Sequence, residues 1–531
     1  MSCRSPTRTG TSRSTSSAPR GEPEQSVQIV AVIAIAAARE VISKLHESVD
    51  SEKRSAIRGA YALRLGPFLV ERMSAPRLGD YVQEQDRLSN RALFGYGISA
   101  APVIYAYVLI LIMYMKFASV QLGISTAVIG TIFLAAKVWD AVTDPMVGFL
   151  SDRTKSRFGR RRPWILASAP LLALFSIMAW APPEGLGDTQ LIVWITVSIF
   201  GFYTAYTLFE VPHMSLGAEI SIKATERNRV FGFRQALKVL GMGVAFIVGS
   251  AVIESGVGPT RTMAYILGAM TLLLIFGGVS MLPAERAEYQ GRGPANPIEA
   301  VRDVFSNPHA RLLLLVVFID AIGVGGIGAL TPFVVDYVVG EPQMIPALLG
   351  ANMGASLLSI PVWIRLSRHF EKRRLMLYSM IGSAVGYGLI FFVGEGDWHI
   401  VLVSSLIAGF SGGCPNSLGY TLKSEIIDFD EHRTGQRKEG AYFAGWAFMS
   451  KLAAGIMIGI VGWALAIAGF DGQAEEQTEL VKTTMLVLMG SLPLICYLFG
   501  AVFFSKFSLS EADHAVIRLE LDARAAETAS S

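Results

Sequence analysis

The amino-acid sequence predicts an all-α polytopic membrane protein, with twelve transmembrane helices arranged as two six-helix bundles. Of its 531 residues, 52% are hydrophobic and only 17% are charged, whereas soluble domains carry roughly 25% charged residues. Twelve apolar stretches follow one another, and most reach the length of about 20 residues that a helix needs to cross a bilayer. Too few charges remain to cover the surface of a soluble globule of this length.

Residues 1–91 are predicted to form a disordered or loosely ordered cytoplasmic extension. Residues 1–26 are rich in Ser, Thr, Arg and Pro and contain almost nothing apolar to bury. The apolar run at 27–38 is about a dozen residues long, which is too short to span a bilayer. The alternative is that translation starts at Met73 and that the extension is not part of the native protein.

A polar break at 284–311 divides the apolar stretches into two sets of six. We therefore expect an N-terminal bundle over 92–283, a cytoplasmic linker at the break, a C-terminal bundle over 312–505 and a cytoplasmic tail over 506–531. Two such halves are typical of a carrier built from repeats. The expected spans are 94–117, 124–150, 164–182, 190–214, 231–253, 263–283, 312–338, 345–364, 375–394, 399–421, 441–469 and 483–505.

The distribution of basic residues predicts the orientation of these spans. Loops after even-numbered spans hold almost all of the loop Lys and Arg residues, whereas loops after odd-numbered spans contain only Arg261 and Lys482. Cytoplasmic loops of membrane proteins are enriched in Lys and Arg, so the even-numbered loops and both termini are expected in the cytoplasm. The protein is accordingly predicted to lie in the cytoplasmic (inner) membrane.

The basic loops of the two halves resemble each other, which indicates a duplicated six-helix unit. The loop after the second span contains Asp152, Arg153 and Arg160, and the equivalent loop of the second half contains Arg368 and Arg373. We expect these side chains to form ion pairs that stabilise one closed state of a carrier at its cytoplasmic side. The alternative is that their charges only set the topology.

The second span carries Lys137, Asp140 and Asp144 at a depth where charges are costly. On a helix, the two aspartates lie about 40° apart around the axis and roughly 6 Å apart along it. Two carboxylates this close repel each other when both are ionised, which favours binding of a cation or a proton between them. The alternative is a structural ion pair between Lys137 and Asp140, which leaves Asp144 unexplained.

The fourth span presents a second polar group, in which Thr207 and Glu210 are three residues apart and share one helix face. Arg234 at the start of the fifth span and Lys451 in the eleventh supply opposite charges. The negative and positive charges of these side chains therefore roughly cancel around a shared cavity. One added cation would change the net charge of that cavity, as coupled transport requires.

Other classes of protein have no signal in the sequence. The formal net charge of +3 is too small to suggest a nucleic-acid binder. Three cysteines form no disulfide framework or metal motif, and no phosphate-cradling loop or zinc-hydrolase motif is present. Because no nucleophile–base constellation is evident, we expect neither an enzyme nor a cofactor other than a coupling ion.

Three segments combine these charges into longer motifs. Residues 137–148 read KVWDAVTDPMVG, residues 206–212 read YTLFEVP, and residues 427–440 read IDFDEHRTGQRKEG. These motifs resemble those of the glycoside–pentoside–hexuronide:cation symporters, a family of the major facilitator superfamily. The resemblance covers about residues 92–510, whereas the first 90 residues have no counterpart.

The resemblance implies a site for Na⁺, Li⁺ or H⁺ formed by Asp140, Asp144 and Thr207. Thr143 stands where melibiose-type members have an asparagine, and this difference leaves open which ion is coupled. The resemblance also implies that Lys451 responds to cation binding.

The resemblance further implies substrate binding by the carboxylate of the fourth span together with the arginine of the fifth. The expected substrate contacts are Glu210, Arg234, Lys137, Tyr206 and Met214. Sugar-binding members have an aspartate in the first span and an aromatic residue soon after the fourth-span carboxylate, where this chain has Ile104 and Met214. These departures weaken a sugar assignment and make an amphipathic solute plausible.

The sequence as a whole predicts a cation-coupled secondary active symporter of a small organic solute, sugar-like or amphipathic, that works by alternating access. It is expected to function as a monomer. The alternative is a non-transporting membrane sensor or assembly factor on a carrier scaffold. The sequence does not decide the substrate, Na⁺ against H⁺, or symport against exchange.

Overall fold

The computed structural model describes residues 87–221, 224–285, 304–435 and 439–530. Within these ranges all regular elements are helices. The predicted extension over 1–91, with the alternative start at Met73, lies almost wholly outside the described residues, and so does most of the predicted linker over 284–311.

The N-terminal bundle contains six spans, two of which include a short π-helical segment. The π-helix η1 (Phe117–Gln121) continues α5, and η2 (Ala245–Gly249) joins α9 to α10, so that α9, η2 and α10 form the fifth span. The helices are α5 (Asn90–Lys116), α6 (Thr126–Arg153), α7 (Arg162–Trp180), α8 (Asp188–Glu219), α9 (Ala224–Val244), α10 (Ser250–Glu254) and α11 (Val257–Ser280).

The C-terminal bundle also contains six spans, the first of which is broken at Gly326 between α13 and α14. Short π or 3₁₀ segments continue three of its spans: η4 (Val335–Val339), η6 (Leu389–Phe392) and η7 (Val487–Ser491), and the 3₁₀ turn η5 (Pro342–Met344) precedes α15. The helices are α13 (Pro308–Gly325), α14 (Ile327–Val334), α15 (Ile345–Leu366), α16 (Lys372–Gly388), α17 (Trp398–Thr434), α18 (Glu439–Ala468), α19 (Glu479–Leu486), α20 (Leu492–Phe504) and α21 (Glu511–Ser530).

Twelve helices among the described residues are long and apolar enough to cross a membrane, which confirms the predicted number of spans. Local sequence signals mark several of their ends. The Ser89 and Asn307 side chains accept hydrogen bonds from the first backbone N–H groups of α5 and α13, as N-cap residues do. Gly435, with a φ of +71°, ends α17 in the left-handed conformation that glycine adopts without strain.

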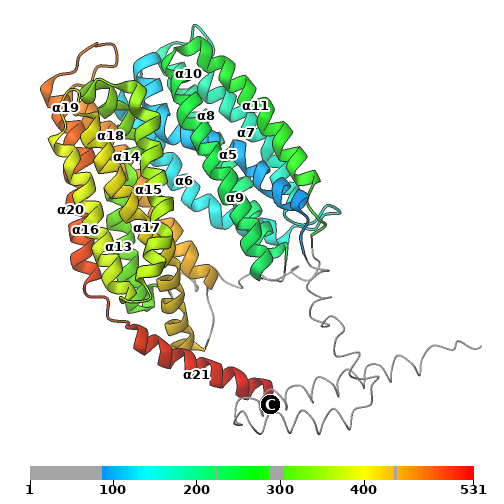
Figure 1. Cartoon of the computed structure of the whole chain (residues 1–531). Helices are drawn as coiled ribbons and strands as arrows, with labels where there is room; N and C mark the ends of the chain where they lie inside the picture. Colours follow the sequence, from blue (N-terminus) through cyan, green and yellow to red (C-terminus); the bar gives the residue numbers. More distant parts are fainter. Residues whose placement is uncertain (1–86, 222–223, 286–303, 436–438, 531) are drawn as a thin grey trace, which may run out of the picture. The chain divides into compact units, whose positions relative to one another are not determined.

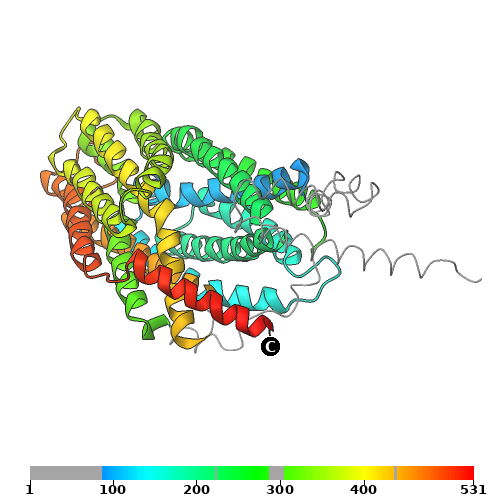
Figure 2. The same ribbon diagram turned by 60° about the horizontal axis from the view of Figure 1, so that its bottom comes forward.

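Each bundle is held together by helix pairs that approach closely. In the first bundle α5 packs against α9 and α11, and α7 packs against α8 and α11 (Figure 1). In the second, α17 packs against α15 and α16, and α13 packs against α18 and α20 (Figure 2). Glycine permits such contacts: a Cβ atom on Gly278 of α11 would lie 2.5 Å from the Gly95 carbonyl oxygen of α5.

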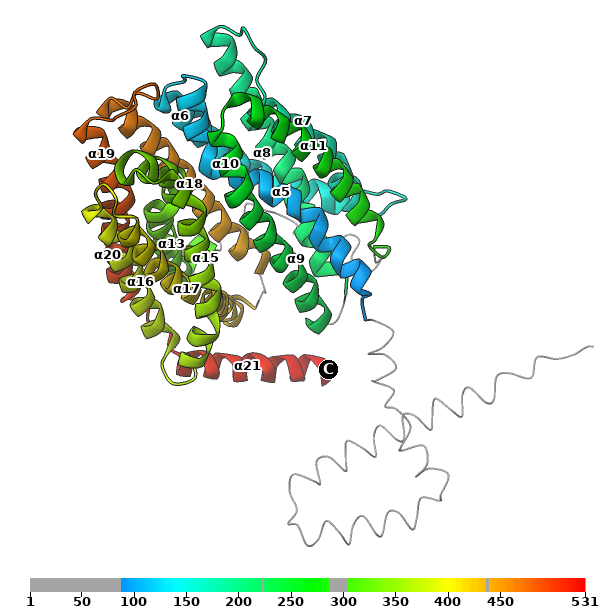
Figure 3. The ribbon, with the colours of Figure 1, turned by 45° about the horizontal axis from the view of Figure 1, so that its top comes forward.

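The two bundles meet mainly along α6 and α18, which lie side by side between them (Figure 3). A Cβ atom on Gly130 of α6 would lie 3.0 Å from the Cα of Gly462, and one on Gly455 would lie 2.6 Å from the Lys137 Cβ. Small residues on α18 therefore bring its backbone against α6. This contact places the charged residues of α6 at the boundary between the bundles.

A second contact closes the bundle boundary at one end. Lys116 of α5 lies 2.6 Å from Asp336 of η4 in the other bundle and 3.6 Å from Glu254 of α10. These three side chains help to line a cavity of about 250 Å³. Nearby, the Gln473 amide donates a 2.8 Å hydrogen bond to the Val120 carbonyl oxygen, again across the boundary.

The C-terminal tail contains the helix α21, which packs against α17 (Figure 1). His514 lies 3.0 Å from Asp428 and Arg518 lies 3.7 Å from the same carboxylate. Ile517 of α21 is itself buried. The tail is thus fastened to the part of α17 that continues beyond the predicted apolar span.

Candidate cation and substrate site

Asp140 and Asp144 lie one turn apart on α6, and α8 places a hydroxyl group between them. The Asp140 side chain is fully buried, whereas that of Asp144 is 25% exposed. Thr207 Oγ1 lies 2.8 Å from Asp140 Oδ1 and 3.1 Å from Asp144 Oδ1. The hydroxyl has one proton to donate, so the two carboxylates share it. The structure thus brings together the three residues predicted to bind a cation.

Lys451 reaches this pair from the other bundle and supplies a positive charge. Its Nζ donates a 2.5 Å hydrogen bond to Asp144 Oδ2 and lies 3.0 Å from Asp140 Oδ2. Asp140 Oδ2 is buried, with Lys451 as its near counterion. The ammonium group therefore lies where a cation bound by both carboxylates would lie.

Lys137 lies on the same face of α6, but its main contacts are aromatic. Its Nζ is 3.9 Å from Asp140 Oδ2 and donates a 3.1 Å hydrogen bond to the Tyr107 hydroxyl. The same Nζ lies over two aromatic rings, 4.8 Å from the centroid of Tyr107 and 4.2 Å from that of Tyr203. Cation–π contacts of this kind stabilise a desolvated ammonium by about 2 kcal/mol. Lys137 is therefore held mostly by tyrosine faces, and Lys451 is the nearer counterion of Asp140.

Thr143, also predicted at the cation site, does not contact the carboxylate groups in this conformation. It is buried, and its hydroxyl donates a 3.2 Å hydrogen bond to the Asp140 backbone carbonyl one turn earlier. Such bonds satisfy a hydroxyl inside a helix. Thr143 therefore supports α6 next to the site in the described state.

The predicted substrate residues Glu210 and Arg234 form an ion pair between α8 and α9. Arg234 Nη2 lies 2.5 Å from Glu210 Oε1 and 2.7 Å from Oε2. One turn before Glu210, the Tyr206 ring stacks on Tyr107 with centroids 4.6 Å apart, and one turn after it Met214 is 39% exposed. Thr207 and Glu210 share a face of α8, so the cation site and the ion pair lie on neighbouring turns of one helix.

A buried histidine next to this ion pair was not identified from the sequence. His213 is stacked between Tyr96 and Phe209, with ring centroids 4.1 Å and 4.8 Å away. Its Nε2 lies 3.0 Å from Ser99 Oγ and 3.1 Å from the Tyr96 carbonyl oxygen. Ser99 Oγ also lies 2.9 Å from that carbonyl oxygen, so the ring nitrogen, the hydroxyl and the carbonyl form one group of polar contacts. A single histidine in an apolar span forms no sequence pattern, so these contacts of His213 could not be predicted.

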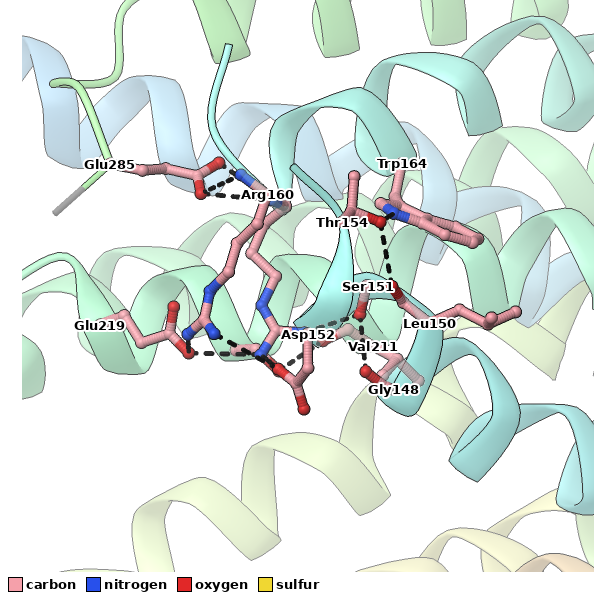
Figure 4. A network of polar contacts seen from close by, with 12 residues as sticks. Gly148, Leu150, Ser151, Asp152, Thr154, Arg160, Trp164, Val211, Glu219 and Glu285 are labelled. Atoms are coloured by element: carbon pink, nitrogen blue, oxygen red, sulfur yellow. Dashed lines mark hydrogen bonds and ion pairs between the residues drawn. The ribbon is translucent and has the colours of Figure 1, made fainter. Parts of the chain in front are cut away.

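Two predicted gating residues of the first basic loop, Asp152 and Arg160, belong to a polar network inside the N-terminal bundle (Figure 4). Arg160 lies 2.7 Å from Glu219 of α8 and 3.7 Å from Asp152, and Arg161 contacts the same two carboxylates. The Glu285 carboxylate accepts hydrogen bonds from successive backbone N–H groups at the start of α7, where a negative charge is favoured.

Of the other predicted gating residues, Arg153 and Arg373 also contact their own bundle. Arg153 lies over the Phe149 ring at 3.8 Å, Arg373 donates to the Ser505 carbonyl oxygen, and Arg368 is exposed. Ion pairing between the bundles by these residues stays a prediction for another conformation.

The comparison with protein families decides the class of this chain. Residues 95–511 match the sequence profile of the family described as MFS/sugar transport protein. The chain belongs to this family. The resemblance to cation symporters of the major facilitator superfamily is thereby confirmed, and so is the predicted class of multi-pass membrane transporter.

Relatives of this major facilitator transporter include several proteins that are named as symporters. The chain is 25% identical over 427 residues to inner membrane symporter YicJ of Escherichia coli (strain K12), which covers 79% of this chain and 92% of that protein. It is 27% identical over 453 residues to sodium-dependent lysophosphatidylcholine symporter 1 of Homo sapiens, covering 78% and 82%. A crystal structure of nucleoside transporter NupG is similar to this chain, with a TM-score of 0.60 at 12% identity. The match covers 78% of this chain and all of the NupG chain, and it supports the fold.

In this major facilitator transporter, the oxygen atoms available to a cation come from two carboxylates and one hydroxyl. No group of three or more His, Cys, Asp or Glu side chains suited to a metal ion occurs among the described residues. These oxygens belong to Asp140, Asp144 and Thr207, the residues predicted to bind the coupling ion.

Proposed function

We propose that this transporter is a symporter that couples entry of Na⁺, Li⁺ or H⁺ to uptake of a small organic solute by alternating access. The observation that carries the proposal is the position of Lys451 between Asp140 and Asp144. An internal ammonium group in a two-carboxylate site is a counterion that an incoming cation can replace. Relatives named as sodium-dependent and glycoside/cation symporters support the same coupling.

The cation step follows from the charges on α6. A cation held by Asp140, Asp144 and the Thr207 hydroxyl neutralises the carboxylates and removes the need for Lys451 at the site. Because Lys451 belongs to α18, its release weakens a tie between the bundles. Cation binding thereby changes the balance between two arrangements of the bundles, which coupled transport requires.

The substrate step uses the polar groups beside the cation site. Glu210 and Arg234 offer acceptors and donors for hydroxyl or head-group atoms, while Lys137 and Tyr206 lie on the neighbouring turns. The exposed Met214 gives an apolar contact in place of an aromatic platform. This combination suits a sugar-like or amphipathic solute, in line with relatives named for glycosides and for lysophosphatidylcholine.

The proposal includes the membrane setting. The Lys and Arg distribution supports an inner-membrane protein with both termini in the cytoplasm. In that orientation, the end closed by Lys116 and Asp336 faces outward, so the described conformation is closed to the exterior. We propose that one chain, acting as a monomer, completes the cycle.

The experiment that tests the proposal needs no substrate. The thermal stability of the purified full chain is recorded in NaCl, LiCl, KCl and choline chloride over a range of pH, for the wild type and for Asp144→Asn. A ligand that binds only the folded state stabilises it by RT ln(1 + [L]/Kd). We expect selective stabilisation by Na⁺ or Li⁺, or an Asp144-dependent effect of pH if the coupled ion is H⁺.

The matched control is Asp188→Asn, because Asp188 is an exposed acid at the start of α8. It should respond to each salt as the wild type does. If neither ions nor pH act through Asp144, coupled transport is refuted and a sensor or assembly role on the carrier scaffold becomes the better account.

A further inference from the structure

One acidic side chain inside the C-terminal bundle takes no part in the proposed cation or substrate steps. Asp320 lies on α13, about two turns inside the first residue of the predicted span 312–338, and α13 packs against α18 and α20. A Cβ atom on Gly500 of α20 would lie 2.5 Å from Asp320 Oδ1 and 2.8 Å from the Met380 methyl group. The missing side chain at Gly500 therefore provides the space that the carboxyl group occupies.

Asp320 differs from the other acids at this depth in having no counterion. Asp140, Asp144 and Glu210 each contact a lysine or an arginine. Asp320 Oδ1 is enclosed and has no hydrogen-bond partner among the described residues, and no described basic side chain forms an ion pair with Asp320. The side chain as a whole is only partly buried.

The titratable side chains next to Asp320 on α16 and α20 are uncharged at neutral pH, and the charged Lys451 of α18 contacts Asp140 and Asp144 of α6. From α20 they are Cys496 and Tyr497, and from α16 Tyr387, whose ring stacks on Tyr497 with centroids 6.0 Å apart. The side of α18 that faces α13 contributes Ala454 and Met457. An ionised carboxylate in such surroundings costs several kcal/mol, whereas the neutral acid loses far less on leaving water.

We propose that Asp320 is a proton-binding site of the C-terminal bundle, separate from the cation site on α6. In the described packing of α13 against α20 the carboxyl group holds the proton, and movement of α13 toward water releases it. The break at Gly326 allows this half of the span to move apart from the half that carries Asp336. A metal ion is a poorer occupant, because one carboxylate supplies too few oxygen ligands.

The test follows the proton directly and does not depend on transport. The full chain is reconstituted in phospholipid bilayers, and infrared difference spectra are recorded between neutral and alkaline pH. The signal is the carbonyl stretch of a protonated carboxylic acid. We expect this band in the wild type at neutral pH, its loss in Asp320→Asn, and its retention in the exposed control Asp188→Asn and in Asp144→Asn.

Three results would overturn the proposal: no such band in the wild type at neutral pH, a band that survives in Asp320→Asn, or a band lost only in Asp144→Asn. The last result would transfer the proton to the cation site. If Asp320→Asn does not fold, the wild type is labelled with dicyclohexylcarbodiimide, an apolar reagent that adds to protonated carboxyl groups. Mass spectrometry must then find the adduct on Asp320, and adducts only elsewhere reject the site. None of these readouts requires the Asp140–Asp144 site to bind Na⁺.

Discussion

Replacing Lys451 by methionine should raise the affinity of the transporter for its coupling cation. Methionine keeps the length and the apolar stem of the lysine but removes the ammonium group between Asp140 and Asp144. In the wild type an incoming cation must displace that group, whereas in the variant it meets two carboxylates without a nearby competitor. The variant should also be less stable than the wild type in choline chloride, since a buried carboxylate has lost its partner.

The magnitude follows from the geometry of the ion pairs. Unit charges 4 Å apart attract by about 4 kcal/mol at an effective dielectric constant of about 20, and the two contacts of Lys451 are shorter than this. Desolvation of the three charges offsets most of the attraction. A remaining coupling of about 1–3 kcal/mol between Lys451 and the cation corresponds to an affinity about 5- to 150-fold higher in the variant.

The assay is a titration of thermal stability with the cation that stabilises the wild type, performed on Lys451→Met, on Lys451→Arg and on Lys482→Met. Lys451→Arg keeps the competing charge, and Lys482 pairs with the exposed Glu479 at the start of α19, so both controls should bind the cation much as the wild type does. Equal or weaker cation binding by Lys451→Met would refute the idea that the lysine competes with the cation.

Three further predictions follow from other contacts. Thr207→Val should weaken cation binding about tenfold, because it removes a hydroxyl that contacts both carboxylates, and the same titration measures this loss. Lys116→Asp should separate the ends of the two bundles that Lys116 and Asp336 join, and the added change Asp336→Lys should bring these ends together again. The distance between spin labels on the loops before α6 and before α19 measures the separation. No recovery in the double variant would refute the idea that this ion pair holds the two ends together. Gly159→Ala should lower the free energy of unfolding by about 1–3 kcal/mol, because Gly159 has a φ of +99° and a Cβ there would collide with the Glu285 carboxylate. Gly185→Ala should lower it less, because Gly185 has a φ of +78° but open space around it. Thermal unfolding of the two variants measures the difference.

The number of spans and the residues of the candidate cation site on α6 could be predicted because both depend on local pattern. Long apolar runs specify membrane helices, and the spacing of Asp140 and Asp144 places them on one face. Local pattern also misplaces ends where a helix leaves the apolar region. The predicted span 399–421 is part of α17, which continues to Thr434 through polar residues that the apolar run does not include.

Contacts between the bundles could not be predicted from the residues alone, because they join segments far apart in the chain. Lys451 and Asp144 are separated by 307 positions, and only the packing of α18 on α6 brings them together. The same holds for Lys116 and Asp336. The tyrosine contacts of Lys137 were equally hidden, since Tyr107 lies in an apolar span without any feature that distinguishes it from a lipid-facing or packing residue.

The two lysines that join the bundles have a common chemistry but different consequences for transport. Lys116 and Lys451 each contact two acids, and breaking either set of contacts leaves partly buried charges without a counterion, which costs free energy. Under the proposed mechanism, a cation at Asp140 and Asp144 removes this cost at the Lys451 tie, because it replaces the ammonium as counterion. It does nothing for the Lys116 tie, which lies at the closed end. Cation binding alone therefore weakens the contact of Lys451 with α6, while the contact between Lys116 and Asp336 persists. The free energy of that second contact must be offset by substrate binding or by contacts that form at the opposite end of the bundles.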